Sequence, residues 1–287
     1  MELLQAIEDD DFDQVVNLVD EGFDYNQPYY GQYPILTAIS NGNGEIINFL
    51  FSLDDLDLYV KDDQGDSALH LAVKNDDYNL VNDLIGYVDI DDTNNYGESA
   101  LSIALSNRFE DIAQLLVEND AKIRTDDLMK SIELADGRFM LDHYGPIDDR
   151  LMKKLLDLTI GYSSESFEML VEYKPEQVER IIKDDKHSTF LIAAIQSGDT
   201  DLILRLLKLG ANINNTNNYG NTPLHEAVLS EANIDTIKTL LESGADKEIR
   251  NDSGETAEET AKIMGYKTIA NFIKGFKMPT LTKSARR

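Results

Sequence analysis

Apolar residues recur along this chain in clusters at helical spacing, and short polar stretches that contain glycine separate the clusters. Ile46, Ile47 and Leu50 lie one, three and four positions apart, so they share one face of a helix. Other clusters with this spacing contain Leu3, Leu4 and Ile7, then Val15, Val16 and Val19, then Leu80, Val81 and Leu84, then Ile112, Leu115 and Leu116, and then Ile269, Phe272 and Ile273. The pattern predicts a chain of short helices that are each apolar on one face.

The polar stretches share a pattern in which a turn is followed by a helix. It is most complete at residues 218–227, which read Asn-Tyr-Gly-Asn-Thr-Pro-Leu-His-Glu-Ala. Gly220 can adopt the positive φ of a tight turn, Thr222 can cap a helix, and Pro223 fits the first helical position. Gly244 then ends a second helix. Related segments occupy residues 30–38, 64–72, 95–104 and 253–261.

The turn glycines recur at a constant period. Gly31, Gly65 and Gly97 are 34 and 32 residues apart, and Gly220 and Gly254 are 34 apart. With this period and these motifs, the chain resembles the ankyrin repeat. The resemblance implies an all-α solenoid of about eight stacked helix-turn-helix units, joined by β-turn loops, with the middle units diverged.

The segments differ in how well they match the repeat. Residues 1–126 are interpreted as an acidic N-terminal block that begins with a cap, and residues 186–276 as a C-terminal block that ends with a cap. Residues 127–185 keep helical spacing without the turn motif. Four helices are predicted there, around Leu128 to Leu134, Leu151 to Leu158, Phe167 to Val171 and after Pro175. This middle segment is either two diverged helix pairs or an inserted helical segment. Residues 277–287 are predicted to be a basic, disordered tail.

Composition narrows the classes of protein. The chain has no cysteine, which excludes disulfides, thiolate metal sites and cysteine nucleophiles. It has no basic leader and no long apolar run, so we expect a cytoplasmic, intracellular protein without a transmembrane segment.

Negative charge is concentrated in the first half. The whole chain has a net charge of −28, and residues 1–126 hold 28 acidic and 5 basic residues, a net charge of −23. Residues 127–185 have a net charge of −6, and residues 186–287 have a net charge of +1. If each of the four N-terminal units adds about 8–10 Å, this half carries about one net charge per 1.4–1.7 Å, close to the value of about 1.7 Å for duplex DNA. The acidity disfavours direct binding of nucleic acid and favours a basic partner.

Catalytic and metal-binding motifs are absent from the sequence. Gly42 and Gly44 lack the lysine of a phosphate loop, and the acidic runs at residues 54–57 and 89–92 lack the spacing of an EF-hand. The resemblance assigns His70 and His225 to a position whose imidazole ties neighbouring repeat loops together. We therefore predict no enzyme activity, no cofactor and no metal site.

The resemblance also indicates a partner-binding surface, because ankyrin proteins usually bind on the concave side. Its predicted residues beside the turns of the first block are Tyr29, Tyr30, Gln32, Asp63, Gln64, Asp66, Asn95, Tyr96 and Glu98, with Ser40, Asn41, Lys74, Asn75, Ser106 and Asn107 at the ends of the first helices. The equivalent residues of the second block are Asp185, Lys186, Ser188, Gln196, Ser197, Asn218, Tyr219, Asn221, Leu229 and Ser230.

The tyrosines near the turns have two interpretations. Tyrosine offers a rigid apolar area and a hydroxyl group together, which suits recognition. Tyr96 and Tyr219, which precede their glycines, could equally pack one repeat on the next. For the cluster of Tyr29, Tyr30 and Tyr33 we favour contact with a partner.

Two functions remain after these exclusions. The first is an interaction module whose acidic half occludes a basic protein surface, in its sharpest form a DNA-mimic inhibitor of a nucleic-acid-binding protein. The second is an adaptor that joins two partners, one at each repeat block. A third hypothesis, an enzyme within residues 127–185, has no motif in its favour.

Overall fold

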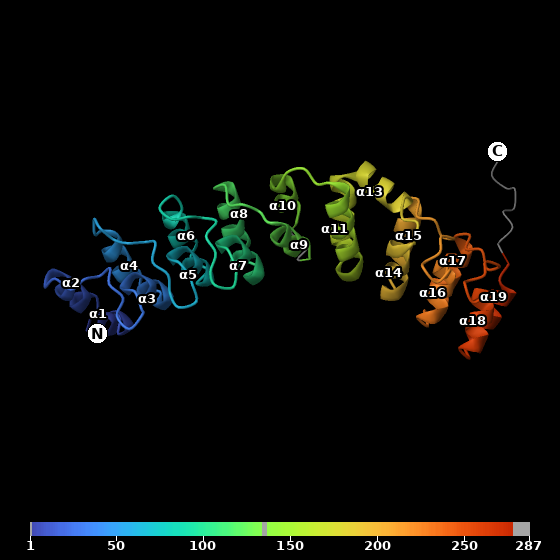
Figure 1. Cartoon of the computed structure of the whole chain (residues 1–287), viewed down its shortest axis with the longest axis horizontal. Coiled ribbons are helices and arrows are strands. Elements are labelled where there is room, and N and C mark those ends of the chain that lie inside the picture. Colours follow the sequence, from blue (N-terminus) through green and yellow to red (C-terminus); the bar gives the residue numbers. More distant parts are fainter. Residues whose placement is uncertain (1, 134–136, 278–287) are drawn as a thin grey trace, which may run out of the picture. The chain divides into compact units, whose positions relative to one another are not determined.

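The chain is built from helices and turns, as predicted. The computed structural model describes residues 2–133 and 137–277, and these contain no strand, only isolated bridges such as that between Tyr29 and Gln32 (Figure 1). Leu134 and residues 278–287, the greater part of the predicted tail, lie outside the described residues. The chain divides into two compact units. Unit 1 comprises residues 1–131 and 139–144, and unit 2 comprises residues 132–138 and 145–287.

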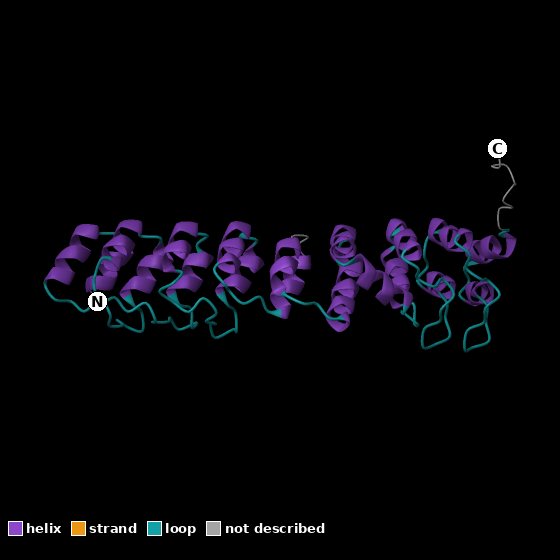
Figure 2. Cartoon of the chain, turned by 90° about the horizontal axis from the view of Figure 1, so that it is seen from above, coloured by secondary structure: helices purple, strands orange, loops and turns teal. Residues whose placement is uncertain are grey.

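Unit 1 contains four successive helix pairs. The first helices of the pairs, α1, α3, α5 and α7, pack on one another in order, and among the second helices α2 packs on α4 and α6 packs on α8. The turn loops lie along one edge of the unit (Figure 2). The bounds are α1 Glu2–Glu8, α2 Phe12–Asp20, α3 Pro34–Asn41, α4 Gly44–Phe51, α5 Ala68–Lys74, α6 Tyr78–Leu84, α7 Ala100–Asn107 and α8 Glu110–Glu118.

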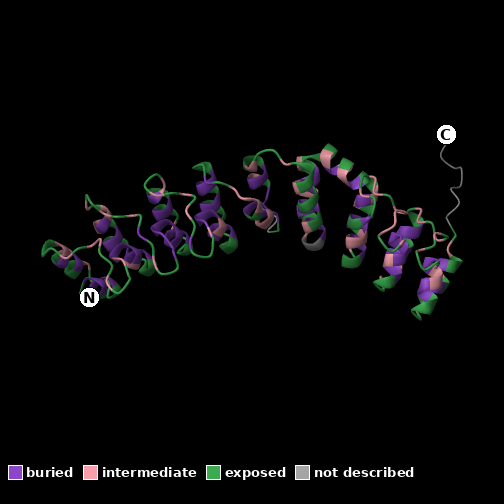
Figure 3. Ribbon diagram, viewed as in Figure 1, coloured by how far each residue is buried: buried purple, intermediate pink, exposed green. Residues whose placement is uncertain are grey.

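Burial differs between the two helices of a pair. Ala68 to Val73 of α5 are all buried, because this helix lies between the first helices of both neighbouring repeats (Figure 3). In the second helix α6, Leu80, Val81 and Leu84 are buried, while Asn82 and Asp83 are exposed. No repeat buries its apolar surface alone, so the stack as a whole provides the core.

Local sequence signals set the ends of these helices. Ser67 and Ser99 precede α5 and α7 and accept or donate the hydrogen bonds of a capping box. Pro34 occupies the first turn of α3, and Gly42, with a φ of 72°, ends that helix in the left-handed region. The repeated turn-and-helix pattern therefore leads to helix boundaries close to those expected.

Unit 2 has a longer helix at its start and regular pairs after it. Helix α11 packs on α12, α13 and α14, after which α14 packs on α16 and α16 on α18. The bounds are α11 Asp149–Tyr162, α12 Ser164–Tyr173, α13 Pro175–Lys183, α14 Thr189–Ser197, α15 Thr200–Lys208, α16 Pro223–Leu229, α17 Ile234–Glu242, α18 Ala257–Ile263 and α19 Lys267–Gly275.

The diverged middle segment contains one helix more than the sequence pattern predicted. Helices α9 (Thr125–Glu133), α11, α12 and α13 match the expected clusters, whereas α10 (Gly137–Tyr144) was not expected. Helices α11 to α13 form a group of three rather than a pair. The division between the units falls within residues 132–145, and the boundaries at residues 126 and 185 remain predictions.

Candidate protein-binding surface

The turns that precede α5, α7 and α16 have the same hydrogen-bonded geometry. In the first, Gly65 N–H donates to Asp62 O at 2.9 Å, and Asp62 N–H donates to Asp66 O at 3.0 Å. The Asp62 carboxylate also accepts from the backbone N–H groups of Gln64 and Asp66, both at 2.8 Å. Asn94 and Asn217 make the same bonds in the other two turns. An Asp or Asn at the start of the turn thus holds the residues at its tip in place.

Two neighbouring turns in unit 1 are joined directly. Asn95 N–H donates to Gln64 O at 2.9 Å, and Asn95 Nδ2 donates to Asp63 O at 3.1 Å. A Cβ atom on Gly65 would lie 2.6 Å from Asn95 Oδ1 and 2.8 Å from Asn95 N, so only glycine permits this approach. Hydrogen bonds therefore fix the turn at residues 94–98 against the turn at residues 62–66.

Two buried histidines, one in α5 and one in α16, each join a first helix to the turn that follows it. His70 Nδ1 lies 2.7 Å from the Ser67 hydroxyl, and His70 Nε2 lies 3.0 Å from the carbonyl oxygen of Glu98. His225 makes the same contacts with Thr222 at 2.8 Å and Glu255 at 2.9 Å. This geometry agrees with the structural role expected for both imidazoles.

At Asp66 and Asn221 the position after the turn glycine faces the interior of the repeat, whereas Gln32 at the first turn is exposed. Asp66 is 1% exposed, and its carboxylate pairs with Lys74 and accepts a hydrogen bond from Asn94 Nδ2 at 2.9 Å. Asn221, the equivalent residue in unit 2, is also buried. Among the predicted contact residues, Asp66 and Asn221 therefore belong to the repeat itself. Glu98 is half-buried, and its side chain accepts from Asn94.

The position before the turn glycine faces solvent. Tyr30, Tyr96 and Tyr219 are 83%, 72% and 73% exposed. The interpretation that Tyr96 and Tyr219 pack one repeat on the next is therefore wrong. At Gln64 and Tyr219, the backbone carbonyl group accepts a hydrogen bond from the next turn, and the side chain does not take part.

The first turn of unit 1 is a tighter hairpin than the others. Tyr29 and Gln32 exchange backbone hydrogen bonds at 2.9 and 3.1 Å, and Tyr30 and Gly31 form the two-residue tip with φ values of 55° and 82°. Left-handed backbone is costly for a bulky residue such as Tyr30. Tyr29 is half-buried, and its hydroxyl donates to Asp24 O at 3.0 Å. Tyr30 is thus the tyrosine of this cluster that projects furthest into solvent.

The exposed residues at these tips form one candidate surface, which we call the tip surface. It comprises Tyr30, Gln32, Asp63, Gln64, Asn95 and Tyr96. The Asp63 carboxylate lies against the neighbouring turn, 3.6 Å from the place where a Cβ of Gly31 would stand. The surface therefore combines two exposed phenol rings with amides and a carboxylate on a backbone that is held in place by hydrogen bonds.

The row of turns in unit 1 ends at Arg124. No heavy atom lies within 4 Å of a Cβ built on Gly97, in contrast to Gly65. Arg124 instead donates to Gly97 O at 2.9 Å and to Ser99 Oγ at 3.1 Å, and it pairs with the buried Asp127. The side chain of Arg124 thus supplies donors where the next repeat has no turn. Sequence reasoning did not identify this role.

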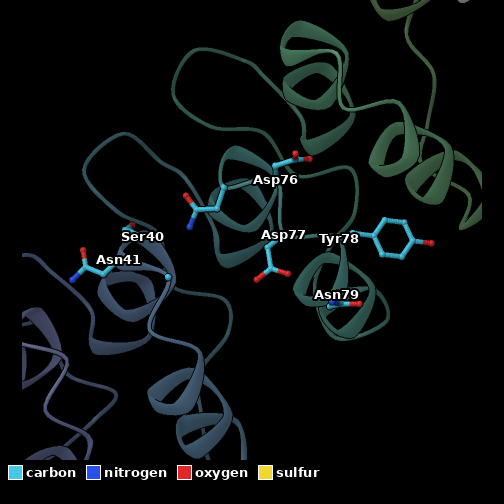
Figure 4. Close-up of a pocket in the computed structure, with 8 residues that line it drawn as sticks. Ser40, Asn41, Asp76, Asp77, Tyr78 and Asn79 are labelled. Atoms are coloured by element: carbon cyan, nitrogen blue, oxygen red, sulfur yellow. The ribbon is translucent and has the colours of Figure 1, made fainter.

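A polar depression of about 560 Å³ lies beside the ends of α3 and α5 (Figure 4). Ser40, Asn41 and Asn75, which the resemblance assigned to the concave side, line it together with Gly42, Asp76, Asp77, Tyr78 and Asn79. Asp77 caps α6 by accepting from Leu80 N–H, and in Figure 4 the Tyr78 ring extends away from Ser40 and Asn41. The lining offers carboxylates and amides but no cation.

The cations of the acidic half are largely committed to internal pairs. Lys61 pairs with Asp92, Lys74 with Asp66, and Arg124 with Asp127. These are three of the five basic residues in positions 1–126. Most of the carboxylates in this half therefore have no lysine or arginine to neutralise them.

Two exposed tyrosines in loops of unit 1 were not predicted. Tyr59 is 75% exposed and Tyr87 is 67% exposed, both in loops that follow second helices. Tyr87 follows Gly86 directly, at the position where Ala245 follows Gly244. The large residue at a position occupied elsewhere by alanine could have indicated this exposed tyrosine from the sequence.

A search of the described residues finds no group of histidine and carboxylate side chains that could hold a metal ion. None of the helices described is both long enough and apolar enough to cross a membrane.

Comparison with known families agrees with the geometry of the turns and helix pairs. A family model described as ankyrin repeats, with three copies, matches residues 3–94, 57–127 and 160–251. The chain belongs to the ankyrin-repeat family. The matches leave out residues 128–159, which contain most of α9, all of α10 and most of α11. As an ankyrin-repeat protein, the chain is a protein–protein interaction module, and this family is typically non-catalytic.

Individual proteins match short stretches of the chain, or longer stretches at lower identity. The human 2-5A-dependent ribonuclease is 40% identical over 87 residues, which are 30% of this chain and 11% of that protein. The Dictyostelium discoideum NAD-dependent deacetylase sir2B is 22% identical over 236 residues, which are 80% of this chain and 28% of that protein. Human protein phosphatase 1 regulatory subunit 27 is 33% identical over 112 residues, which are 36% of this chain and 71% of that protein. The chain thus spans less than a third of the length of the first two. The ankyrin repeat domain of Bcl-3 is a similar solved structure, with 19% identity, coverage of 96% of this chain and 98% of that one, and a TM-score of 0.39.

Proposed function

We propose that this ankyrin-repeat protein acts by stoichiometric binding, and that the tip surface of its acidic half docks on a basic surface of a protein partner and occludes it. One observation carries the proposal: the exposed Tyr30 and Tyr96 lie on the turns before and after the turn that carries the exposed Asp63, within a segment whose net charge is −23. Rigid aromatic side chains supply contact area, and the unpaired carboxylates select a basic partner.

The sharper form of the proposal is competition with nucleic acid. The charge per unit length of the acidic half is similar to that of duplex DNA, so a protein surface that binds DNA or RNA is a suitable partner. The chain would then inhibit that partner as a DNA mimic, without any catalytic step.

The test is affinity capture from a lysate of the native host at about 0.05 M and about 0.2 M salt, since long-range attraction weakens over this range. The test variant is Asp63→Lys/Glu98→Lys. The control is Asp13→Lys/Asp20→Lys, which changes the net charge equally at exposed positions of α2. Asp66 is left unchanged because it is buried.

A nucleic-acid-binding partner that the wild type and the control hold, and that the Asp63/Glu98 variant or the higher salt releases, supports the proposal. Its displacement by duplex DNA would support the inhibitor form. A partner that all three proteins hold equally at both salt concentrations would show that the tip surface is not the binding site.

An adaptor is the second candidate, and the presence of two compact units favours it. Tyr219 is as exposed in unit 2 as Tyr96 is in unit 1. An adaptor requires that two partners bind the same molecule at once, which sedimentation of the mixed complex measures.

A further inference from the structure

A second surface of unit 1 is a groove with a mixed apolar and polar lining between the second helices α4 and α6, which we call the α4–α6 groove. Its volume is about 530 Å³, within the range of about 300–1,000 Å³ that is common for binding pockets. Its apolar lining is Ile47, Phe51, Leu53, Leu56, Leu58 and Leu80. Phe51 and the three leucines of the following loop are only half-buried.

The loop after α4 creates this groove. The loops after α2, α6 and α17 contain a glycine with positive φ, namely Gly22, Gly86 and Gly244, whereas no residue from Ser52 to Lys61 in the loop after α4 has a positive φ. Twelve positions separate Leu50 from the start of the next turn at Asp62, against eleven between Leu240 and Asn251. The longer loop places Leu53, Leu56 and Leu58 beside α4 and α6, where they line the groove.

The wall of the groove is held in place by the preceding repeat. Asn26 Nδ2 donates to Asp55 O at 2.6 Å, and Asp57 N–H donates to Asn26 Oδ1 at 2.9 Å. The Asp57 carboxylate also accepts from Tyr59 N–H at 2.9 Å. Because these bonds fix the loop before any ligand binds, binding requires little ordering of the groove.

The polar lining of the groove is negative. Asp54 and Asp83 contribute carboxylates, Tyr87 contributes an exposed phenol, and no lysine or arginine is among the lining residues. The exposed Asp55 and Asp57 lie in the same loop. The neighbouring groove between α6 and α8 differs, because Leu115 is its one aliphatic lining residue beside Tyr78, Asp111, Gln114 and Glu118.

We propose that the α4–α6 groove binds a short segment of a partner protein that carries two aliphatic side chains flanked by lysine or arginine. The leucines and Phe51 would cover the aliphatic side chains, and Asp54 and Asp83 would pair with the flanking cations. A second copy of this chain is a poor occupant, because its net charge of −28 would oppose approach to a negative groove. The site shares no residue with the tip surface, so it does not depend on the function proposed above.

The test is selection of a random peptide library displayed on phage against the full chain, followed by measurement of the affinity of the enriched peptides. The variants are Asp54→Lys/Asp83→Lys and the milder Asp54→Asn/Asp83→Asn, and the control is Asp13→Lys/Asp20→Lys. Enriched peptides should contain paired aliphatic residues with flanking lysine or arginine. Their affinity should fall about tenfold with the lysine variant and about threefold with the asparagine variant, and change less than about twofold with the control.

A second measurement locates the bound peptide. Methyl resonances of Leu53, Leu56 and Leu58 should shift on titration with an enriched peptide, and the Asp63→Lys/Glu98→Lys variant should bind it as the wild type does. The proposal is overturned if no peptide is enriched, if the enriched peptides lack basic residues, or if the Asp54/Asp83 variants bind them unchanged. It is also overturned if a synthetic peptide of residues 277–287 fills the groove more tightly than any selected sequence, because the occupant would then be the chain itself.

Discussion

His70 donates a hydrogen bond from Nε2 to the carbonyl oxygen of Glu98, 28 residues further along the chain and in the next repeat. A carbonyl oxygen only accepts, so Nε2 carries the proton, and Nδ1 of the neutral ring accepts from the Ser67 hydroxyl and from Ser67 N–H. One imidazole thus caps its own helix and fixes the following turn, and it does so only in the neutral state.

This tautomer predicts that acid weakens the fold. Burial lowers the pKa of His70 and His225 below the ordinary value of 6.5, although the carbonyl groups of Glu98 and Glu255 and nearby carboxylates oppose this shift. With a folded pKa below the unfolded one, the stabilisation is present above pH 6.5 and is lost as the pH falls below 6.5 and through the lower folded pKa. The unfolding temperature should therefore decrease between about pH 7.5 and about pH 5.5.

The variant His70→Gln/His225→Gln supplies the comparison for the pH dependence. It should be less stable than the wild type at neutral pH by about 1–3 kcal/mol for each buried contact that is lost. Its unfolding temperature should depend less on pH, because it lacks the two buried histidines. His143 and His187 remain in both proteins, so they do not contribute to the difference. Equal pH dependence of wild type and variant would contradict the assignment.

Gly65→Ala should destabilise the protein more than Gly97→Ala. Both glycines have left-handed backbone, with φ values of 77° and 75°, so alanine carries a conformational cost of about 1–2 kcal/mol at each site. Only at position 65 does the new Cβ collide with Asn95 and disrupt the bond from Asn95 N–H to Gln64 O. Urea unfolding of both variants measures the difference, and equal losses would show that the contact between the turns adds nothing.

Arg124→Ala should lower the free energy of unfolding by about 2 kcal/mol, because it leaves the buried Asp127 carboxylate without its cation. The loss is moderate because the side chain of Arg124 is partly exposed to solvent. It also removes the donors to Gly97 O and Ser99 Oγ. Lys122→Ala is the matched control, because Lys122 is exposed and its backbone makes the contact to Asp91. Amide hydrogen exchange of residues 96–99 should accelerate in the Arg124 variant alone.

Tyr30→Asn should stabilise the chain and weaken binding. Asparagine tolerates the left-handed backbone of the hairpin tip better than tyrosine, so unfolding should become harder by about 0.5–1 kcal/mol. Removal of the exposed ring should weaken the complex with the partner identified by affinity capture by about tenfold. Tyr219→Asn, at an equivalent tip without positive φ, is the control for stability. A loss of stability at position 30 would show that the ring supports the hairpin.

Much of this architecture follows from local sequence. Gly65, Ser67 and His70 occupy motif positions with known roles, namely the positive φ of the turn, the helix cap and the hydrogen bond to the next turn. The turns, the caps and the histidine bridges could therefore be predicted. The helices of the middle segment were also recognised from apolar spacing, except α10, whose apolar residues Phe139 to Leu141 are consecutive rather than helically spaced.

The direction in which each polar side chain points was harder to predict. Asp66 and Tyr96 are close in motif position, yet one is buried by Lys74 and Asn94 and the other is exposed. The choice depends on contacts between repeats, which a single period of sequence does not contain. The role of Arg124 and the groove beside Leu56 arise for the same reason, from a missing turn and from an added loop residue.

The end of the turn row at Arg124 also bears on how such an array can lengthen during evolution. A duplicated copy of residues 62–93 placed before Arg124 would bring its own glycine, histidine and turn, and would find a matching neighbour on both sides. A copy placed after Arg124 would meet a carbonyl group that already has a donor. Tandem duplication in this half is therefore expected to be tolerated upstream of Arg124 and selected against beyond it.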